Sequence, residues 1–242
     1  MKRPKAIARV TPNDDTLPSR ASVARLSLYL RSLEEFARQG RVTISSGRLG
    51  EALGVTDAQV RKDLAIVGSL GQPGVGYSTG ELISAIRHTL GIDREWRVAL
   101  VGVGNLARAL LRYRGFPQQG FRIVALVDSD PAKIGQRVEG LEIHSPAMLP
   151  AVVAATRAEL GVVAVPAEAA QSVAEALVAA GIRGILNFAP VVLRLPPSVS
   201  LVAVDLAVQL EQLAFLVQAS CREVARPGSR RRDPGPTAPA VP

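Results

Sequence analysis

The stretch from Arg97 to Leu111 constrains the fold of this chain more than any other segment. It starts as an apolar run, turns through two glycines, and continues with leucines at helical spacing. Strand, glycine-rich turn and helix in this order open the dinucleotide-binding unit of an α/β sheet. Gly102 suits the tight turn, Gly104 lets a pyrophosphate approach the backbone, and Ala107 allows close packing of helix and strand. The predicted cofactor-binding turn consists of Gly102, Val103, Gly104, Asn105, Leu106 and Ala107.

An acidic residue follows at the distance that this unit requires. A second apolar run, residues 123–127, ends at Asp128, 24 residues beyond Gly104. A carboxylate there accepts hydrogen bonds from the adenosine ribose and repels a 2′-phosphate, which favours NAD⁺ and NADH over NADP⁺ and NADPH. Asp130, two residues on, is a second candidate. The alternative is an α/β turn whose glycines serve packing alone and whose aspartate caps a helix.

Composition narrows the class of protein. The 242 residues suffice for two modest domains, and 48% hydrophobic residues support real cores. The net charge of +8 suggests an anionic partner, although the basic excess is mild and lies outside the nucleotide-binding unit. A single cysteine, Cys221, excludes an intrachain disulfide and favours a reducing compartment. The chain shows no membrane-spanning run and no signal peptide, so we expect a cytoplasmic protein with neither a membrane nor a metal partner.

Residues 21–91 follow the pattern of a winged helix-turn-helix. Apolar residues at helical spacing predict a first helix that stops at Gly40. A second helix starts after Ser45 or Ser46, which are candidate N-caps, and stops at Gly54. Two short helices joined by a glycine-containing turn would place the second of them in the major groove of DNA.

The helix expected to read DNA begins at Thr56. Thr56 and Gln59 have the spacing of a capping box, and two apolar residues one turn apart face the core. Four polar residues are left for the outer faces, namely Gln59, Arg61, Lys62 and Asp63. Gln59 can pair with adenine, whereas Arg61 and Lys62 can reach guanine or phosphate.

Four glycines from Gly68 to Gly76 predict a β-hairpin wing beside the reading helix, and one more helix then ends at Gly91. The candidate DNA contacts are Ser45, Ser46, Thr56, Gln59, Arg61 and Lys62 on the helices, with Gly74, Gly76 and Tyr77 on the wing. A small helical dimerisation or substrate domain with a solvated charged helix is the alternative for this region.

Apolar runs alternate with helical segments through the rest of the chain, which predicts an α/β fold with a parallel, doubly wound sheet. Asp205 then caps a long apolar helix suited to dimerisation. The expected domains are a disordered basic arm (residues 1–20), a winged helix (21–91), a Rossmann NAD(H)-binding domain (92–203), a C-terminal dimerisation helix (204–225) and a disordered tail (226–242).

Several separate motifs make residues 21–225 resemble the Rex family of redox-sensing transcriptional repressors. The motifs are QVRKDL at 59–64, GVGY at 74–77, GVGNL at 102–106, YRGF at 113–116, DSDP at 128–131, GILNFAP at 184–190 and VDL at 204–206. The resemblance implies a homodimer that binds a palindromic double-stranded operator when NAD⁺ dominates and releases it on binding NADH. It also implies a C-terminal helix that is swapped onto the partner subunit.

The resemblance further implies a switch between two states. Tyr113 and Asp205 match family residues that interact differently in the two states, and Arg31 matches an arginine that pairs with that aspartate in the DNA-binding form. Leu206 matches a position beside the nicotinamide. We expect an apolar pocket near Leu206 and Phe188 that favours the neutral, reduced ring.

The chain departs from the family pattern in three places. Pro73 and the pair Ile66–Val67 stand where relatives tend to have a basic wing residue and an aromatic. Ala107 replaces the third glycine, which is an accepted variant.

Two other functions remain open, an NAD-dependent oxidoreductase and a CoA- or nucleotide-binding module without DNA contact. An oxidoreductase needs an acid or base near the transferred hydride. His88 and His144 are expected to be structural or exposed, and Cys221 to serve packing. We therefore expect no catalytic residue and no enzymatic activity.

Overall fold

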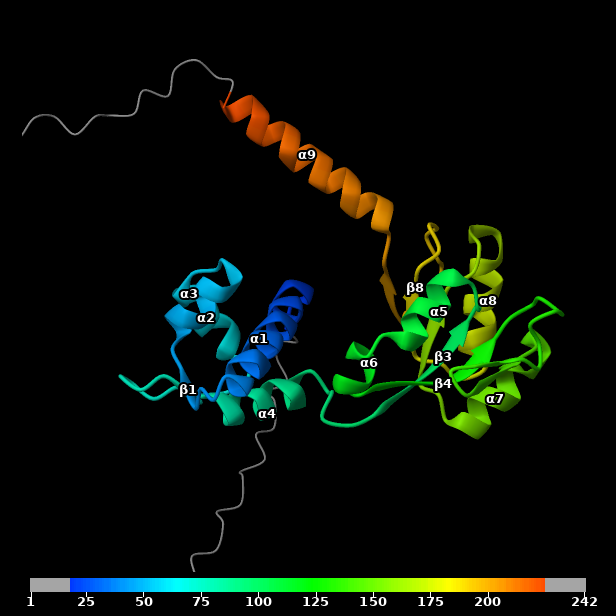
Figure 1. Ribbon diagram of the computed structural model, residues 1–242, viewed down its shortest axis with the longest axis horizontal. Coiled ribbons are helices and arrows are strands. Elements are labelled where there is room, and N and C mark those ends of the chain that lie inside the picture. The colour runs from blue at the N-terminus through cyan, green and yellow to red at the C-terminus, as the bar shows by residue number, and fades with distance from the viewer. Residues whose placement is uncertain (1–17, 225–242) are drawn as a thin grey trace, which may run out of the picture. The chain divides into compact units, whose positions relative to one another are not determined.

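The computed structural model describes residues 18–224, with side chains up to Ser220. Most of the predicted basic arm, the predicted tail and the side chain of Cys221 lie outside the described residues. The chain divides into two compact units, Met1–Val98 with Leu111–Val124 and Ala99–Leu110 with Ala125–Pro242. Figure 1 shows the elements in chain order, from blue to red.

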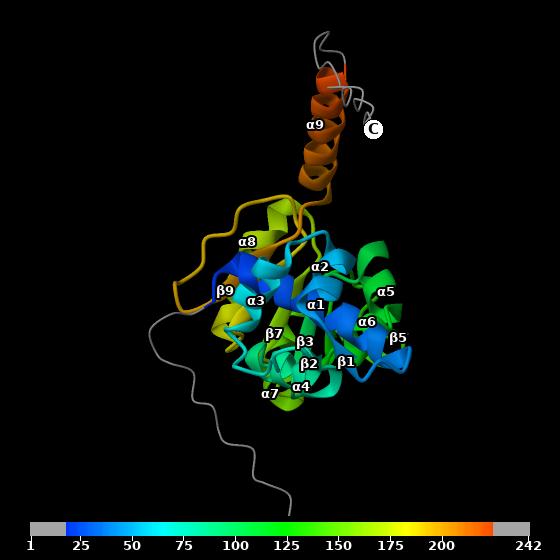
Figure 2. The ribbon, with the colours of Figure 1, turned by 90° about the vertical axis from the view of Figure 1, so that its left-hand side faces the viewer.

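The first unit contains the predicted helix-turn-helix, which is confirmed (Figure 2). Its helices are α1 (Arg20–Arg38), α2 (Ser46–Leu53), α3 (Asp57–Leu64) and α4 (Thr79–Thr89). Two short strands, β1 (Thr43–Ile44) and β2 (Tyr77–Ser78), pair antiparallel. The helices enclose one apolar core, in which the buried side chains include Leu26, Tyr29, Leu30, Leu33, Leu49, Val60, Leu64, Leu82 and Ile86.

Local signals set the ends of α2 and α3. The Ser45 hydroxyl accepts a hydrogen bond from the Arg48 N–H at 3.2 Å, so Ser45 rather than Ser46 is the N-cap of α2. Gly54 ends that helix in the left-handed conformation, with φ +66°. The Thr56 hydroxyl accepts from the Gln59 N–H at 3.2 Å, which is half of the predicted capping box. Among the described residues, no hydrogen bond from the Thr56 N–H to the Gln59 side chain completes the box, and the Gln59 amide nitrogen donates to Asp63.

The wing is shorter than the predicted hairpin. It consists of a tight turn closed by a single bridge between Gln72 and Gly76, before Tyr77 enters β2. Gly76 has φ +92°, and a Cβ there would lie 2.5 Å from the Ile44 carbonyl oxygen. The turn therefore requires glycine where it passes the end of β1.

A sheet of seven strands, in the order β5-β6-β4-β3-β7-β8-β9, carries the second half of the fold. Its strands are β3 (Trp96–Val101), β4 (Phe121–Val127), β5 (Arg137–Val138), β6 (Leu141–His144), β7 (Leu160–Val163), β8 (Gly184–Asn187) and β9 (Ser200–Ala203). The pairs β4–β6, β7–β8 and β8–β9 are parallel, and the short edge strand β5 pairs antiparallel with β6. This confirms the predicted α/β class and the mostly parallel sheet.

The strand order reverses at β3. The chain runs outward through β4 and β6 on one side, and then returns to place β7, β8 and β9 on the other side. In open α/β sheets a ligand binds beyond the carboxyl ends of the strands at such a reversal. The turn at Gly102, which follows β3 directly, lies at this point.

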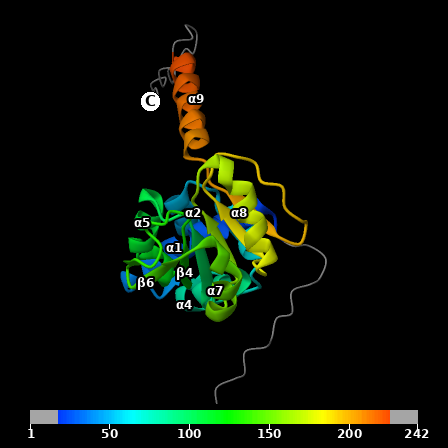
Figure 3. The ribbon, with the colours of Figure 1, turned by 90° about the vertical axis from the view of Figure 1, so that its right-hand side faces the viewer.

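Six further helical segments connect or follow the strands. They are α5 (Asn105–Arg112), α6 (Gly115–Gln118), the 3₁₀ helix η1 (Pro146–Met148), α7 (Leu149–Thr156), α8 (Ala167–Ala179) and α9 (Leu206–Val224). Figure 3 shows α7 and α8 together on one side of the strands. No helix in the described part of the chain has the length and apolar character that crossing a membrane demands.

Candidate functional site

The turn between β3 and α5 has the geometry that a pyrophosphate-binding turn needs. Gly102 is buried with φ +92°, and a Cβ there would lie 2.4 Å from the Ala164 carbonyl oxygen, so this position admits only glycine. At Gly104 an added Cβ would meet no atom within 4 Å. Open space therefore lies over Gly104, where the first N–H groups of α5 have no acceptor within their own helix.

The predicted turn residues divide into a buried and an exposed set. Val103 and Ala107 are fully buried, whereas Gly104, Asn105 and Leu106 are exposed. The Val103 N–H is not available to a ligand, because it donates to an Asp128 carboxylate oxygen at 2.7 Å. The exposed set is the part of the turn that could contact a cofactor.

Asp128 fixes the turn from the end of β4. It is 7% exposed, and besides Val103 it accepts hydrogen bonds from the Asp130 N–H at 2.9 Å and from the Lys133 ammonium at 3.1 Å. Burial raises the pKa of Asp128, but these donors outweigh burial, so the pKa is lowered and the carboxylate is ionised. A carboxylate has about four acceptor positions, and one is left for a ribose hydroxyl.

Lys133 was not anticipated from the sequence. Its ammonium lies 3.1 Å from Asp128 and 3.7 Å from Asp130, and its side chain is 29% exposed. The acid expected to repel a 2′-phosphate thus has a cation beside it, which weakens the repulsion. The spacing of five residues from Asp128 is a signal that could have identified it.

The ends of β8 and β9 bring the other predicted cofactor residues to the same edge of the sheet. Phe188 follows β8 and is half-buried, and Leu206 follows β9 and is 63% exposed. Since β8 and β9 pair in parallel with Asn187 opposite Ala203, both residues lie beyond the carboxyl ends of neighbouring strands. Asp205 accepts hydrogen bonds from the N–H groups of residues 207 and 208, so the predicted cap of the last helix is confirmed.

Asn187 is a structural residue of this edge that the sequence did not reveal. It is 1% exposed, and its side-chain amide donates to the carbonyls of Ala189 and Val191 and accepts from the Ala189 N–H, each at 3.0 Å. These bonds hold the turn that carries Phe188. The one sequence signal for such a turn is the run Asn-Phe-Ala-Pro at residues 187–190.

Two of the three residues expected to switch, Tyr113 and Arg31, are exposed, whereas Asp205 is half-buried. Tyr113 is 53% exposed and contacts Phe116 edge-on, with ring centroids 5.1 Å apart. Arg31 lies on the exposed side of α1, and its side chain has no hydrogen bond or ion pair with another described residue. Both side chains are thus available to new partners.

On α3, the structure corrects the prediction for Asp63. The sequence pattern assigned it to the outer face, but it is 1% exposed and binds Arg25 and Tyr29 of α1. Gln59 is half-buried and donates to Asp63, while Lys62 is exposed. The prediction was wrong because helical spacing around Val60 and Leu64 cannot reveal partners that lie 34 and 38 residues away.

Beside α3, a hollow of about 490 Å³ is lined by Ser45, Ser46 and Arg61 and by the wing. The Arg61 guanidinium donates to Asp57 at 2.6 Å and to the Ser46 hydroxyl at 3.3 Å. The hollow therefore presents the start of α2 and a cation to the same space, a combination that suits a phosphate. Tyr77 is half-buried, and its ring packs against Gly71, so it supports the wing from inside.

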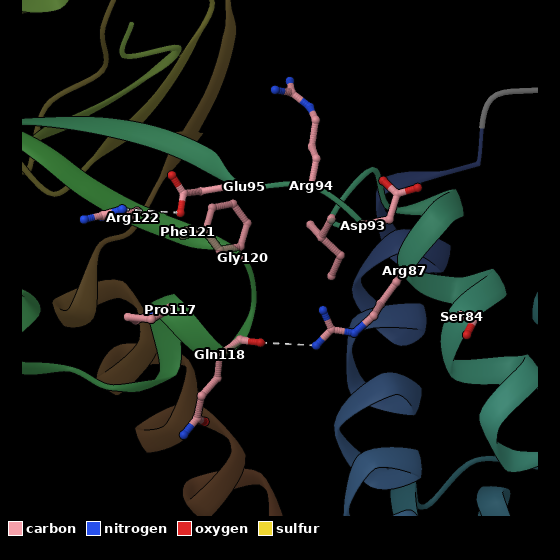
Figure 4. A pocket seen from close by; sticks show the side chains of 11 residues that line it. Ser84, Arg87, Asp93, Arg94, Glu95, Pro117, Gln118, Gly120, Phe121 and Arg122 are labelled. Carbon is pink, nitrogen blue, oxygen red and sulfur yellow. Dashed lines mark hydrogen bonds and ion pairs between the residues drawn. The ribbon is translucent and has the colours of Figure 1, made fainter. Parts of the chain in front are cut away.

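Another hollow in the first unit, of about 600 Å³, is lined by charged side chains, several of which have partners of opposite charge (Figure 4). Arg87 donates to Glu34 at 2.7 Å and to the Gln118 carbonyl at 3.2 Å, as the dashed line to Gln118 shows. The Arg122 guanidinium lies 3.8 Å from the Glu95 carboxylate, measured from Nη1 to Oε2. We assign no ligand to this hollow. Among the described side chains, residues 18–220, no group of three or more His, Cys, Asp or Glu residues could hold a metal ion.

Two family models match separate parts of the chain. Residues 18–65 match a model described as a putative DNA-binding protein N-terminus, and residues 93–191 match a CoA binding domain. The two matches fall on the helix-turn-helix and on the α/β sheet.

Curated relatives match the chain over most of its length. The redox-sensing transcriptional repressor Rex of Desulfitobacterium hafniense is 49% identical over 81% of this chain and 94% of its own. The protein of the same name from Pelotomaculum thermopropionicum is 48% identical over 82% of this chain and 93% of its own.

Solved structures agree with these relatives. The structure of RSP in complex with β-NAD⁺ and operator DNA has a TM-score of 0.81 and 32% identity, and the match covers 86% of this chain and 96% of RSP. RSP in complex with β-NADH has a TM-score of 0.78 and 31% identity, and that match covers 87% of this chain and 100% of RSP. RSP is described as a Rex-family repressor.

Proposed function

Because the chain belongs to the Rex family of redox-sensing transcriptional repressors, we propose that it binds operator DNA when NAD⁺ dominates and releases it on binding NADH. The observation that carries the proposal is the presence of two sites in one chain. A capped helix-turn-helix precedes a glycine turn that has open space at the reversal point of a parallel sheet.

The cofactor residues fall into a shared and a discriminating set. NAD⁺ and NADH have the same adenine half, so Gly102, Gly104 and Asp128 contribute equally to the binding of both. A ligand with equal affinity for two states shifts nothing, so the response has to come from groups near the nicotinamide ring. We assign this role to Phe188 and Leu206, since an apolar environment favours the neutral reduced ring over the cationic oxidised ring.

The switch would use Asp205. Its carboxylate caps α9, and any new cation that pairs with it competes with the N–H groups at the start of that helix. We assign Tyr113 and Arg31 as its alternative partners in the NADH and DNA-binding states. Replacement of Asp205 by Ala would then abolish the NADH response of DNA binding while leaving NADH affinity nearly unchanged.

The reading function would need two copies of the chain. A palindromic site presents two half-sites about one helical turn apart, which a symmetric dimer matches with its two copies of α3. The exposed apolar side chains of α9 suit the dimer contact, with the helix swapped onto the partner. Arg61, Lys62, Ser45 and Ser46 would contact phosphates or bases, with the wing residues Gly74 and Gly76 beside them.

We further infer a cytoplasmic sensor that leaves its coenzyme unchanged. The relatives that support this inference are named as transcriptional repressors. NADH absorbance followed with purified protein tests it, and steady loss of NADH with a carbonyl compound would favour an oxidoreductase instead.

The experiment that tests the DNA function uses the full chain and a pool of random palindromic duplexes. We expect the chain to select one sequence family in the presence of NAD⁺, and NADH to release the selected duplex. Failure to select any sequence would favour the nucleotide-binding module without DNA contact. All measurements need one salt concentration, because phosphate contacts make DNA affinity depend steeply on salt.

A further inference from the structure

The carboxylate of Asp63 connects the reading helix α3 to α1. It is 1% exposed, and four donors surround it. Oδ2 accepts from Arg25 Nε at 2.6 Å and from the Tyr29 hydroxyl at 2.9 Å, while Oδ1 accepts from Arg25 Nη2 at 2.8 Å and from Gln59 Nε2 at 3.1 Å. All of its roughly four acceptor positions are therefore filled.

The charge of this carboxylate fixes the direction of its hydrogen bonds. The Arg25 guanidinium lowers the pKa of Asp63, and although burial opposes this effect, the hydrogen bonds of Tyr29 and Gln59 add to it. An ionised carboxylate can only accept. The carboxamide of Gln59 must therefore turn its nitrogen toward Asp63 and its oxygen away.

This orientation leaves Gln59 with a defined pair of groups for another ligand. Oε1 remains as an acceptor, and Nε2 keeps a second N–H as a donor. The adenine edge in the major groove offers the complementary N6 donor and N7 acceptor, which a glutamine side chain binds in bidentate fashion. A carboxamide that is free to flip would lose this preorganisation.

We propose that Asp63 is a positioning residue for base readout, which holds the carboxamide of Gln59 so that α3 selects adenine at one position of each half-site. The proposal rests on the proposed function, because it concerns the same DNA-reading helix. It adds a residue that the predicted base contacts did not include, and it assigns that residue a specific effect.

The test compares Asp63→Asn with the unaltered full chain on duplexes that carry single base-pair changes within the selected site. In the unaltered chain, replacing one adenine per half-site should weaken binding about tenfold or more. In Asp63→Asn, whose amide can donate as well as accept, that penalty should shrink to about twofold or less. Penalties at the other positions and the salt dependence should stay as they were.

Two variants make the test specific. Gln59→Ala should lose the same adenine preference, and adding Asp63→Asn to it should cause no further change at that position. Glu35→Gln removes an exposed carboxylate of α1 and should leave the whole profile intact. An unchanged profile in Asp63→Asn, or a uniform loss over all duplexes, would overturn the positioning role. Failure of the unaltered chain to select DNA would instead overturn the proposed function.

A measurement without DNA covers the case in which Asp63→Asn does not fold. The side-chain amide signal of Gln59, assigned by its loss in Gln59→Ala, should differ from solvent-exposed glutamines in nuclear magnetic resonance spectra and exchange more slowly with water. A Gln59 amide indistinguishable from exposed glutamines would contradict the proposal.

Discussion

An added Cβ would clash with the backbone at Gly102 but would meet no atom at Gly104. The alanine variants at these two positions therefore form a matched pair of tests. Gly102→Ala would place Cβ 2.4 Å from a backbone oxygen at φ +92°. We expect it to destabilise the fold by about 1–3 kcal/mol or more. Gly104→Ala should fold normally, because nothing lies within 4 Å, yet it should weaken NADH binding at least about tenfold by occupying the pyrophosphate space.

Thermal unfolding and NADH fluorescence titration measure these two effects separately. A Gly104→Ala protein that binds NADH as tightly as the unaltered chain would exclude this turn as the cofactor site.

We expect Lys133 to reduce the preference of the chain for NADH over NADPH. Its ammonium, 3.1 Å from Asp128, offsets part of the charge that would repel a 2′-phosphate. Lys133→Met should therefore raise the preference for NADH over NADPH, by about two- to fivefold for a partly exposed pair. Competitive titrations of the two coenzymes measure the ratio, with Lys62→Met as a control. A fall in the ratio would show that Lys133 mainly supports Asp128.

The contact between α1 and α3 predicts a pH profile of stability. Asp63 has a lowered pKa, so its contribution is present above its usual value of 3.8 and is lost as the pH falls through its folded-state value. Tyr29 affects stability on the alkaline side of the profile. Burial, together with the hydrogen bond to Asp63, raises the pKa of Tyr29 from 10.0 to about 12. Its contribution is therefore present below pH 10 and is lost as the pH rises toward 12.

The variant Tyr29→Phe separates the acid loss of stability from the alkaline loss. It should cost about 1 kcal/mol of unfolding free energy near neutrality and remove the alkaline loss that Tyr29 causes, while keeping the acid loss. Urea unfolding between pH 3 and pH 11 on the full chain measures both. An alkaline limb unchanged in Tyr29→Phe would refute the assignment.

Elements defined by nearby residues were predictable, and interactions between distant residues were not. Ser45, Gly54 and Thr56 lie next to the helix ends that they set, so their sequence positions predicted those ends. The hydrogen bonds between Asp63 and Arg25 join residues 38 positions apart, so they depend on a tertiary contact that spacing does not encode. Asn187 is an exception to this division, because its partners lie only two and four residues further along the chain and the sequence still did not reveal them.

At the candidate cofactor site, too, the sequence predicted the local turn but not the hydrogen-bond partners within it. The sequence predicted the glycine turn after β3 and the position of Asp128 after β4, because the turn between strand and helix has a fixed spacing. The use of Asp128 by Val103 and Lys133 was not found, because a carboxylate bound within its own turn has the same sequence pattern as one that binds ribose.

The long helix α9 indicates how the chain assembles. Its exposed apolar side chains include Leu206, Leu210, Leu213, Phe215, Leu216 and Val217. A monomer rarely exposes such a stripe, so we expect it to be covered in a dimer. Leu213→Asp should weaken dimerisation about 100-fold or more, as charges do at a buried contact, while Gln212→Asp on the same helix should have a smaller effect. Analytical ultracentrifugation distinguishes the species, and a Leu213→Asp protein that stays dimeric would exclude α9 as the contact.

We propose that the coenzyme turn and the DNA-reading helix of one chain are coupled. The most direct measurement is the affinity of the full chain for its selected duplex, at fixed salt, as the ratio of NADH to NAD⁺ increases. We predict a fall of at least about tenfold, which requires a difference of about 1.4 kcal/mol between the two coenzymes in their preference for the DNA-binding state. Equal affinity for DNA at every ratio, with both coenzymes shown to bind, would exclude this coupling.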